Sequence, residues 1–393
     1  MRKLFFGVIY MTGAIMVNAT DVQLLDSVIT EVYITGNITK SENTYDANGN
    51  CLSHATYVWN KETNIWDNSG REEDTYDSEG HMLTQTIYTW LTDKKIWRNS
   101  VKNEFSYDTK GNCLIRTTYR WNASTDTWDN YLTEASTYDA YGNLITAVVR
   151  RWENGAWKNT GKVEYTYDAK NNLLTSLIYN WKNETFTKTS LYTYSYDSNG
   201  NKIQYLYQTW NSSLGWSNQD VEYWTYDEYG YMVCYQKCEW WPDGAWHNID
   251  KIEYVNDSYG YQLEAIWYGW DASSNTWYYQ SKSEYSNDSN GNLLTGTSFV
   301  WNYASSTWEV TGRGENSYNE YGNIIEHIGY YWNPETNSWE KDGRTTYYYH
   351  NMSSTIEQLS TTYYQLSTKL LRDGQLFIQR GDKTYTVTGQ EVK

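Results

Sequence analysis

The chain has 393 residues, among them 22 Trp, 42 Tyr and only two Pro, and its formal net charge is −17. This acidic balance argues against nucleic acid as a partner, because binding to phosphate groups requires clustered Lys and Arg. The abundance of aromatic residues argues against intrinsic disorder and favours β-strands.

Residues 1–19 are typical of a secretory signal peptide. Arg2 and Lys3 supply the positive charge with which such peptides begin. Residues 4–17 form an apolar run too short for a spanning helix, and residues 17–19 (Val-Asn-Ala) form a small-residue cleavage site. No other stretch is apolar for long enough to cross a membrane. We therefore expect an exported protein, secreted or held at the outer cell surface, with no transmembrane span in the mature chain.

Residues 20–44 carry apolar side chains mostly at even positions, such as Val22, Leu24 and Val28. Alternation of this kind is typical of strands. Because the terminal units of a repeat array are usually atypical, we expect these strands to cap the open end of the array that follows.

A Tyr-Asp-x-x-Gly-Asn pattern then recurs along the chain, with local variations. Successive copies of its Asp, which we call the key position, are 29 to 31 residues apart. Self-similarity at a fixed period is the signature of a repeat architecture, so length here reflects copy number rather than domain count. The ten key positions are Asp46, Asp77, Asp108, Asp139, Asp168, Asp197, Asp227, Asp257, Asp288 and Asn319.

Each repeat is predicted to contain two strands joined by a turn at the key position. In the fifth copy the first strand ends in residues 164–168 (Glu-Tyr-Thr-Tyr-Asp), with two Tyr on one face and the Glu on the other. The Asp can accept a hydrogen bond from the backbone two residues on, and the following Gly can adopt a positive φ, as can Asn171 in this copy. The pattern predicts a three-residue hairpin loop with a bulge.

The second strand of each repeat begins with an aliphatic residue and ends at a Trp. A polar loop and a second Trp follow, as with Trp59 and Trp66, although Phe186 takes the second place in the fifth copy. Nineteen such Trp, at roughly 200 Å² each, would be far more apolar surface than a soluble protein exposes. We therefore expect them to pair across the hairpins and to be covered.

Strands of about nine to eleven residues joined by short turns predict an all-β fold, an antiparallel meander of about ten two-stranded repeats of about 30 residues. Because sheets twist, we expect the meander to form an elongated twisted or spiralling sheet. A hairpin pattern around residues 380–383 predicts a short C-terminal β-hairpin tail.

The Tyr-Asp-x-x-Gly-Asn pattern and the aliphatic residue after it, over residues 45–325, resemble the YD repeat of the Rhs family, whose hairpins wind into a hollow shell. With two Trp per repeat, the chain is more similar to the uncharacterised Trp-rich YD-type repeat proteins of Bacteroidetes. The ending, from residues 374–378 (Gly-Gln-Leu-Phe-Ile) to 389–393 (Gly-Gln-Glu-Val-Lys), resembles the C-terminal sorting signal of the type IX secretion system. That resemblance implies the type IX machinery as a partner and translocation across the outer membrane.

These observations together predict the organisation of the chain. The predicted parts are a signal peptide (1–19), N-terminal cap strands (20–44), a YD-like repeat array (45–351), a Ser/Thr-rich linker (352–368) and a C-terminal sorting tail (369–393). Only the array is long enough to present an extended binding face.

Metal and catalytic patterns are weak. Residues 197–201 have oxygen donors at alternate positions, as calcium loops do, but Leu206 stands where an EF-hand needs a Glu. The five His lack metal-ligand spacing, and no motif of a catalytic nucleophile occurs. We therefore expect no catalytic residue, no metal and no cofactor. A carboxylate pair in a cleft that breaks the repeat symmetry would favour an enzyme instead.

The four Cys are poorly placed for disulfides. Cys51 and Cys113 occupy equivalent places two repeats apart, and Cys234 and Cys238 lie four residues apart on one strand. Both separations exceed the about 7 Å that a disulfide allows between Cα atoms. Bridges are expected only if one repeat coils back onto another.

Trp224, Trp241 and Trp267 lie outside the repeat positions. They are our candidate binding residues, because aromatic side chains combine a large apolar face with a polar edge. The sequence favours a non-enzymatic binding scaffold for a glycan or a surface protein. A purely structural or adhesive surface element without a ligand site is the alternative, and a glycan-active enzyme is the third interpretation.

Overall fold

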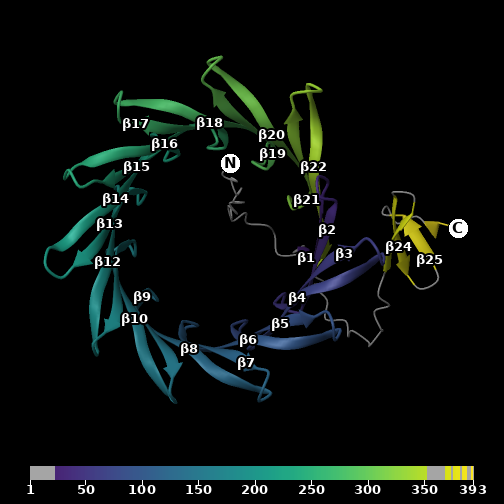
Figure 1. Ribbon diagram of the computed structural model, residues 1–393, viewed down its shortest axis with the longest axis horizontal. Coiled ribbons are helices and arrows are strands. Elements are labelled where there is room, and N and C mark those ends of the chain that lie inside the picture. The colour runs from purple at the N-terminus through teal and green to yellow at the C-terminus, as the bar shows by residue number, and fades with distance from the viewer. Residues whose placement is uncertain (1–22, 352–367, 373–374, 381–382, 387–390, 393) are drawn as a thin grey trace. The chain divides into compact units, whose positions relative to one another are not determined.

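The repeat region forms one antiparallel sheet of 22 strands, in which neighbours in sequence are neighbours in the sheet (Figure 1). The computed structural model describes residues 23–351 and, in the tail, residues 368–372, 375–380, 383–386 and 391–392. The predicted signal peptide and most of the predicted linker lie outside the described residues. Residues 23–350 form one unit and the tail belongs to another.

Most strands of the sheet are 10 to 12 residues long, and they alternate between the two types that the repeat predicts. The bounds are β1 Gln23–Val32, β2 Asn37–Tyr45, β3 Cys51–Asn60, β4 Ile65–Tyr76, β5 Met82–Leu91, β6 Ile96–Tyr107, β7 Cys113–Asn122, β8 Thr127–Tyr138, β9 Leu144–Glu153, β10 Ala156–Tyr167, β11 Leu173–Lys182, β12 Thr185–Tyr196, β13 Lys202–Asn211, β14 Gly215–Tyr226, β15 Met232–Trp240, β16 Trp246–Asn256, β17 Gln262–Asp271, β18 Thr276–Asn287, β19 Leu293–Asn302, β20 Thr307–Tyr318, β21 Ile324–Asn333 and β22 Ser338–Asn351.

The sheet closes on itself, because β1 also pairs with β22. At this seam the backbone N–H of Tyr33 donates to the carbonyl of Asp342 at 2.8 Å, and the hydroxyl groups of Thr30 and Thr345 lie 3.2 Å apart. Figure 1 shows the purple first strands beside the light green β22.

The prediction of an elongated or spiralling sheet is therefore wrong, although the all-β antiparallel meander is confirmed. The twist between strands accumulates around the sheet until its two edges meet, and an even number of strands lets the last one run antiparallel to the first. The array has no open end for residues 20–44 to cap, and β1 and β2 complete the closed sheet instead.

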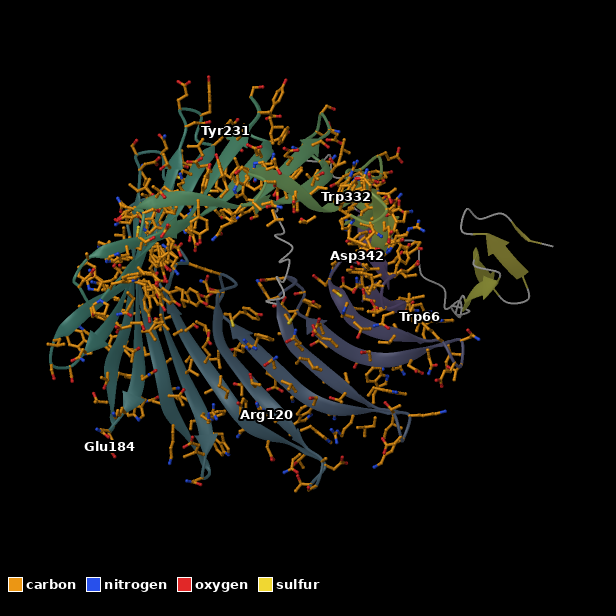
Figure 2. The ribbon with its side chains drawn as sticks, turned by 45° about the horizontal axis from the view of Figure 1, so that its top comes forward. Trp66, Arg120, Glu184, Tyr231, Trp332 and Asp342 are labelled. Carbon is orange, nitrogen blue, oxygen red and sulfur yellow. The ribbon has the colours of Figure 1, made fainter. Side chains whose placement is uncertain are left out.

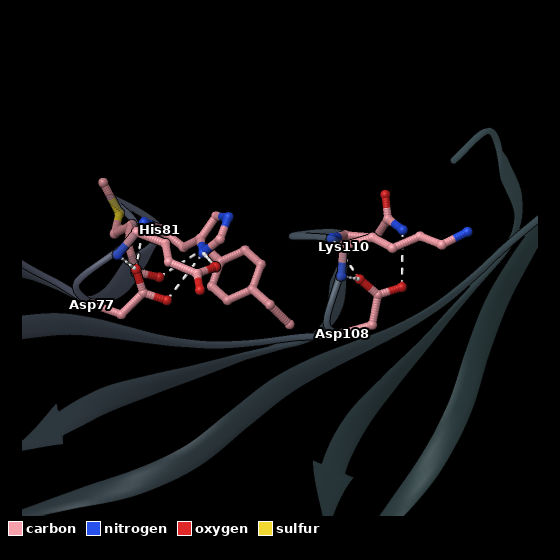
Figure 3. Close-up of polar contacts among 8 residues, drawn as sticks. Asp77, His81, Asp108 and Lys110 are labelled. Carbon is pink, nitrogen blue, oxygen red and sulfur yellow. Dashed lines mark hydrogen bonds and ion pairs between the residues drawn. The ribbon is translucent and has the colours of Figure 1, made fainter. Parts of the chain in front are cut away.

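The turn at the key position is the predicted three-residue loop with a bulge. In the first copy, Asp46 Oδ1 accepts hydrogen bonds from the backbone N–H groups of Asn48 and Asn50, and Gly49 has φ +84°. Tyr45 pairs with Cys51 and Thr44 pairs with Ser53, so Leu52 is the extra residue of the bulge. The side-chain amide of Asn50 donates a second hydrogen bond to Asp46 Oδ2 at 2.8 Å, and this bond, with the backbone bonds, lowers the pKa of Asp46. Figure 3 shows the same arrangement at Asp77 and Asp108.

The Tyr before the key position ties each hairpin to the previous one. Tyr76 donates from its hydroxyl group to the carbonyl of Cys51 at 2.9 Å, and Tyr107 donates to Met82 at 2.7 Å. We call the face of the sheet that carries these residues the Tyr face. The same bond is made by Tyr45, Tyr138, Tyr167, Tyr196, Tyr226, Tyr318 and Tyr349, and amide groups of Asn256 and Asn287 replace it in two repeats.

The opposite face, which we call the Trp face, carries the paired Trp of the hairpin ends. The rings of Trp59 and Trp66 cross edge to face at 5.2 Å between centroids, and Trp181 meets Phe186 at 4.7 Å. The other eight Trp pairs have the same geometry, and no Trp at a repeat position is among the exposed large side chains. The predicted cross-hairpin pairing of the Trp is confirmed.

The tail forms a separate sheet of four antiparallel strands, β23 (Thr368–Arg372), β24 (Gln375–Arg380), β25 (Lys383–Thr386) and β26 (Glu391–Val392). Arg380 pairs with Lys383, which confirms the predicted hairpin. No helix among the described residues is long and apolar enough to cross a membrane. All four Cys, which the structure describes, are free thiols.

Closure of the sheet predicts that a disulfide can join residues 315 positions apart in the chain. The double variant Thr30→Cys/Thr345→Cys should form an intramolecular disulfide under mild oxidation, and peptide mass spectrometry should detect the linked fragments. Thr30→Cys/Thr166→Cys is the control, because β10 lies across the closed sheet from β1 in Figure 1. Absence of the 30–345 link, or its appearance only between two chains, would contradict the closed sheet.

Candidate functional site

On the Trp face, seven repeats enclose a Lys or Arg between aromatic rings and a Glu. In the fifth repeat Lys162 Nζ lies 2.6 Å from Glu164 Oε1 and 4.3 Å from the centre of the Tyr179 ring. Tyr179 donates a hydrogen bond of 2.5 Å to the same carboxylate, and burial together with this bond raises the pKa of Tyr179 to about 12. The basic residues of the seven clusters are Lys40, Arg71, Lys102, Lys162, Lys251, Lys282 and Arg313.

The three repeats that lack this Glu lack its partners as well. Thr133, Leu191 and Val221 stand at the place of the Lys, and Arg150, Gln208 and Cys238 stand opposite them in the place of the Tyr. The cluster is therefore kept or replaced as a whole. Its charges and rings satisfy each other, which indicates a packing role and explains why the Glu recurs in the sequence.

The Tyr face departs from the repeat over β12 to β17. Residues directly opposite each other in an antiparallel ladder project from the same face. One cross-strand row runs Tyr194, Tyr205, Glu222, Lys237, Asp250, and a second runs Trp224, Tyr235, Ile252, Trp267. We call these residues, with their neighbours on the same face, the aromatic surface. It comprises Tyr192, Tyr194, Tyr205, Tyr207, Trp224, Tyr235, Ile252, Tyr254 and Trp267, with Asp220, Glu222, Lys237, Glu239 and Asp250.

Several rings of the aromatic surface contact each other, and all of them are half-buried. Tyr192 stacks on Tyr207 at 4.9 Å between centroids, and Trp224 meets Tyr235 at 5.7 Å. At the place of Trp224 and Tyr235 the fifth repeat has Tyr165 opposite the small Ser176. Contiguous rings are thus a local property of this sector and not of the repeat.

The charges of the aromatic surface are unbalanced. Lys237 lies between Glu222 and Asp250 in the ladder and is 3.8 Å from Glu239. Burial raises the pKa values of Asp220 and Asp250, and Lys237 opposes this shift in both. One ammonium group therefore serves several carboxylates, which favours a ligand that brings hydrogen-bond donors or positive charge.

The structure places two of the three predicted binding residues on this surface. Trp224 is on β14 and Trp267 on β17, and the second row joins them through β15 and β16. Lys202 Nζ lies over the Trp224 ring, 3.8 Å from its centroid, and covers one side of the indole.

Trp241, the third predicted residue, lies apart from these rows, in the loop after β15. Its side chain is 39% exposed, and its ring stacks on His247 at 4.1 Å. It lines a shallow pocket of about 270 Å³, whose other walls are Ser217, Asn218, Gln219, Trp240, Pro242 and Gly244. The structure therefore offers a second, smaller aromatic site at the Trp end of the hairpins.

Sequence reasoning missed the tyrosines of the seventh and eighth turns. Tyr229 and Tyr259 are each 75% exposed, and the rings of Tyr231 and Tyr261 stand where most repeats have Asn. A Cβ on Gly260 would lie 2.2 Å from the Tyr231 ring, so Tyr231 packs onto the next turn. The replacement of Asn by Tyr two residues after another Tyr was the available signal in the sequence.

A pair of carboxylates also breaks the repeat, on the Tyr face of β4. Asp74 is only 8% exposed, and its Oδ1 has no hydrogen-bond partner. Burial and the neighbouring Glu72 raise the pKa of Asp74 to about 6. Gln85 donates to Glu72 at 2.9 Å, which holds that carboxylate in place. The pair can bind a proton near neutral pH, and no group of three metal-ligating side chains occurs in the described part of the chain.

These features define a closed all-β repeat protein with one irregular, aromatic sector. A model of a family of unknown function, DUF3836, matches residues 73–156, within the repeat array. No curated protein matches the chain.

Solved structures show partial similarity. A protein of unknown function from Bacteroides fragilis NCTC 9343 has 19% identity over 31% of this chain and 88% of its own, with a TM-score of 0.28. A DUF3836 family protein from Parabacteroides distasonis ATCC 8503 has 23% identity over 22% of this chain and 88% of its own, with a TM-score of 0.18. The complex TcdB2-TccC3-Cdc42 has 12% identity over 90% of this chain but 22% of its own, with a TM-score of 0.38. Each of these similarities covers less than a third of one of the two chains, so the fold is assigned from the strand pairing of this chain.

Asp74 predicts a pH-dependent contribution to stability. Its pKa in the folded protein lies above the ordinary 3.8, so its ionisation destabilises the fold as pH rises from about 4 to about 6. Asp74→Asn should therefore be more stable than the parent at pH 7.5, by up to about 3 kcal/mol, and similar to it near pH 4. Urea unfolding followed by circular dichroism at both pH values measures this. Asp93→Asn, at an exposed loop residue, is the control, and equal stability of Asp74→Asn and parent at pH 7.5 would contradict the prediction.

Proposed function

We propose that the chain is a non-enzymatic binding scaffold whose aromatic surface binds a glycan. The observation that carries the proposal is the pair of cross-strand rows on β12 to β17, where contiguous rings lie beside carboxylates. The Trp at the repeat positions already pack in pairs across the polar loops, whereas the rings of this sector do not belong to the repeat pattern.

The chemistry of the surface suits a sugar better than an apolar ligand. Sugar rings present C–H groups on their faces and hydroxyl groups at their edges, and binding sites for such molecules combine aromatic walls with a few polar groups. Trp224 and Trp267 supply apolar faces, and Glu222, Lys237 and Asp250 supply hydrogen-bonding groups one row away. A protein ligand would use the same Tyr and Trp anchors.

A location for the protein is proposed from the sequences of its two terminal segments. We propose that the N-terminal signal directs export and that the C-terminal tail engages the type IX secretion machinery, so that the scaffold is secreted or displayed on the cell surface. The tail forms its own sheet, which supports a role separate from that of the repeat array.

A purely structural or adhesive element remains the second candidate. The seven Lys–Glu clusters and the Tyr bonds between hairpins favour it, because they stabilise the closed sheet without any ligand. A glycan-active enzyme would need a reacting pair of groups in a cleft, and Glu72 with the buried Asp74 is one pair of carboxylates that breaks the repeat.

Binding of the purified mature chain to a glycan array tests the proposal. Specific signals are expected, and Trp224→Ala or Trp267→Ala should weaken them about 10-fold, since a stacked ring contributes on the order of 1–2 kcal/mol. Tyr165→Ala, at the place equivalent to Trp224 in the fifth repeat, should leave binding unchanged. Trp241→Ala tests the small pocket separately.

A silent array, with all variants folded by circular dichroism, would sink the proposal and favour the structural element. Signals that survive both Trp224→Ala and Trp267→Ala would show that the ligand binds elsewhere. Hydrolysis of an array sugar that is lost in Asp74→Asn would instead establish an enzyme.

A further inference from the structure

The aromatic surface has more negative than positive charge, and this excess is local. On the Tyr face of β13 to β16, the four carboxylates of Asp220, Glu222, Glu239 and Asp250 share the surface with two ammonium groups, those of Lys202 and Lys237, and with His247, which lies opposite Glu239 in the ladder. In the seven clusters of the Trp face, in contrast, each cluster Glu has a Lys or Arg within ion-pair distance. The regular repeat positions provide no such acidic excess, and the carboxylate group of Glu72 and Asp74, elsewhere on the Tyr face, has only two members.

One of the protein's own cationic side chains already lies on this surface. Lys202 Nζ lies 3.8 Å from the centroid of the Trp224 ring, the geometry of a cation–π contact. Lys202 comes from the start of β13, at the edge of the surface, and its long side chain can move aside without disturbing the ladder. An ammonium group of a ligand could take the same place.

Along each row, successive side chains are spaced like successive sugars in a linear polysaccharide. Adjacent strands are about 4.8 Å apart, which is close to the length of one sugar in a β-linked hexose chain. A chain of sugars lying across the strands would meet Trp224, Tyr235 and Trp267 in succession along one row. The row of Glu222, Lys237 and Asp250 runs parallel, about 7 Å further along the strands, because each residue advances about 3.3 Å.

We propose that the ligand of the aromatic surface is a linear oligosaccharide that carries free amino groups, such as a deacetylated hexosamine chain. Its rings lie on the second row, and its ammonium groups pair with Glu222 and Asp250 and displace Lys202 from Trp224. This inference rests on the proposed function, because it names the class of glycan that the same surface takes. A neutral oligosaccharide would leave the carboxylates without partners.

Isothermal titration calorimetry of the mature chain tests the inference with two probes of equal length, the glucosamine hexamer and the N-acetylglucosamine hexamer. The glucosamine hexamer should bind at least about 10-fold tighter at low salt, and its Kd should rise with salt concentration. Asp250→Asn and Glu222→Gln should each remove most of this preference, whereas Trp224→Ala should weaken binding of the glucosamine hexamer at every salt concentration.

Because the whole chain carries a net charge of −17, a control for unspecific attraction is needed. Glu184→Gln removes the same charge from an exposed loop between β11 and β12 (Figure 2) and should leave both Kd values unchanged. An effect of Glu184→Gln equal to that of Asp250→Asn would overturn the inference.

The remaining outcomes separate the inference from the proposed function. Equal affinity for both hexamers would overturn the cationic ligand while leaving a glycan scaffold in place. Binding of neither hexamer, with silence on the array, would remove both. If an oligolysine peptide of matched charge bound as tightly and did not depend on Trp224, the surface would be a general cation site, and the assignment to an amino sugar would be wrong.

Discussion

Pairing of β1 with β22 constrains every other feature of the sheet. Once the ladder closes, each strand has two hydrogen-bonded neighbours, and no edge is left to pair with another chain. Closure fixes the average angle between hairpins, so each hairpin must keep its register with both neighbours. The Tyr bonds do this at the key turns, and the Trp pairs do it at the other end. The bonds across the seam, such as that between Thr30 and Thr345, complete the ladder.

The two faces of the sheet have different roles. On the Trp face, Lys162, Glu164 and Tyr179 and their equivalents satisfy one another, so this face stabilises the sheet and has little left for a ligand. On the Tyr face, the ladder fixes the position of each side chain but leaves its identity free away from the key Tyr. Here the repeats diverge, into large rings around Trp224 and into an acid pair that includes the buried Asp74. A regular backbone thus holds irregular residues at fixed spacings, as a rigid scaffold for a site requires.

The hairpin could be predicted from the sequence because its causes are local. An Asp that accepts backbone hydrogen bonds and a Gly with positive φ, as at Asp46 and Gly49, determine the turn wherever they occur. Closure could not be predicted, because it depends on a small rotation between hairpins that no single residue determines. Trp224 and Trp267 were recognisable because they break the repeat. Their neighbour Tyr235 was not, since a bulge in each hairpin decides which residues share a face.

The even count of strands also governs how the molecule can change size. Units enter or leave an antiparallel ring only as whole hairpins, because an odd strand would bring the two ends together in parallel. Each hairpin contributes two strand spacings, about 10 Å, to the circumference. Duplication of a repeat would therefore increase the circumference of the closed sheet. Relatives with different copy numbers would differ in circumference while keeping the same strand pairing.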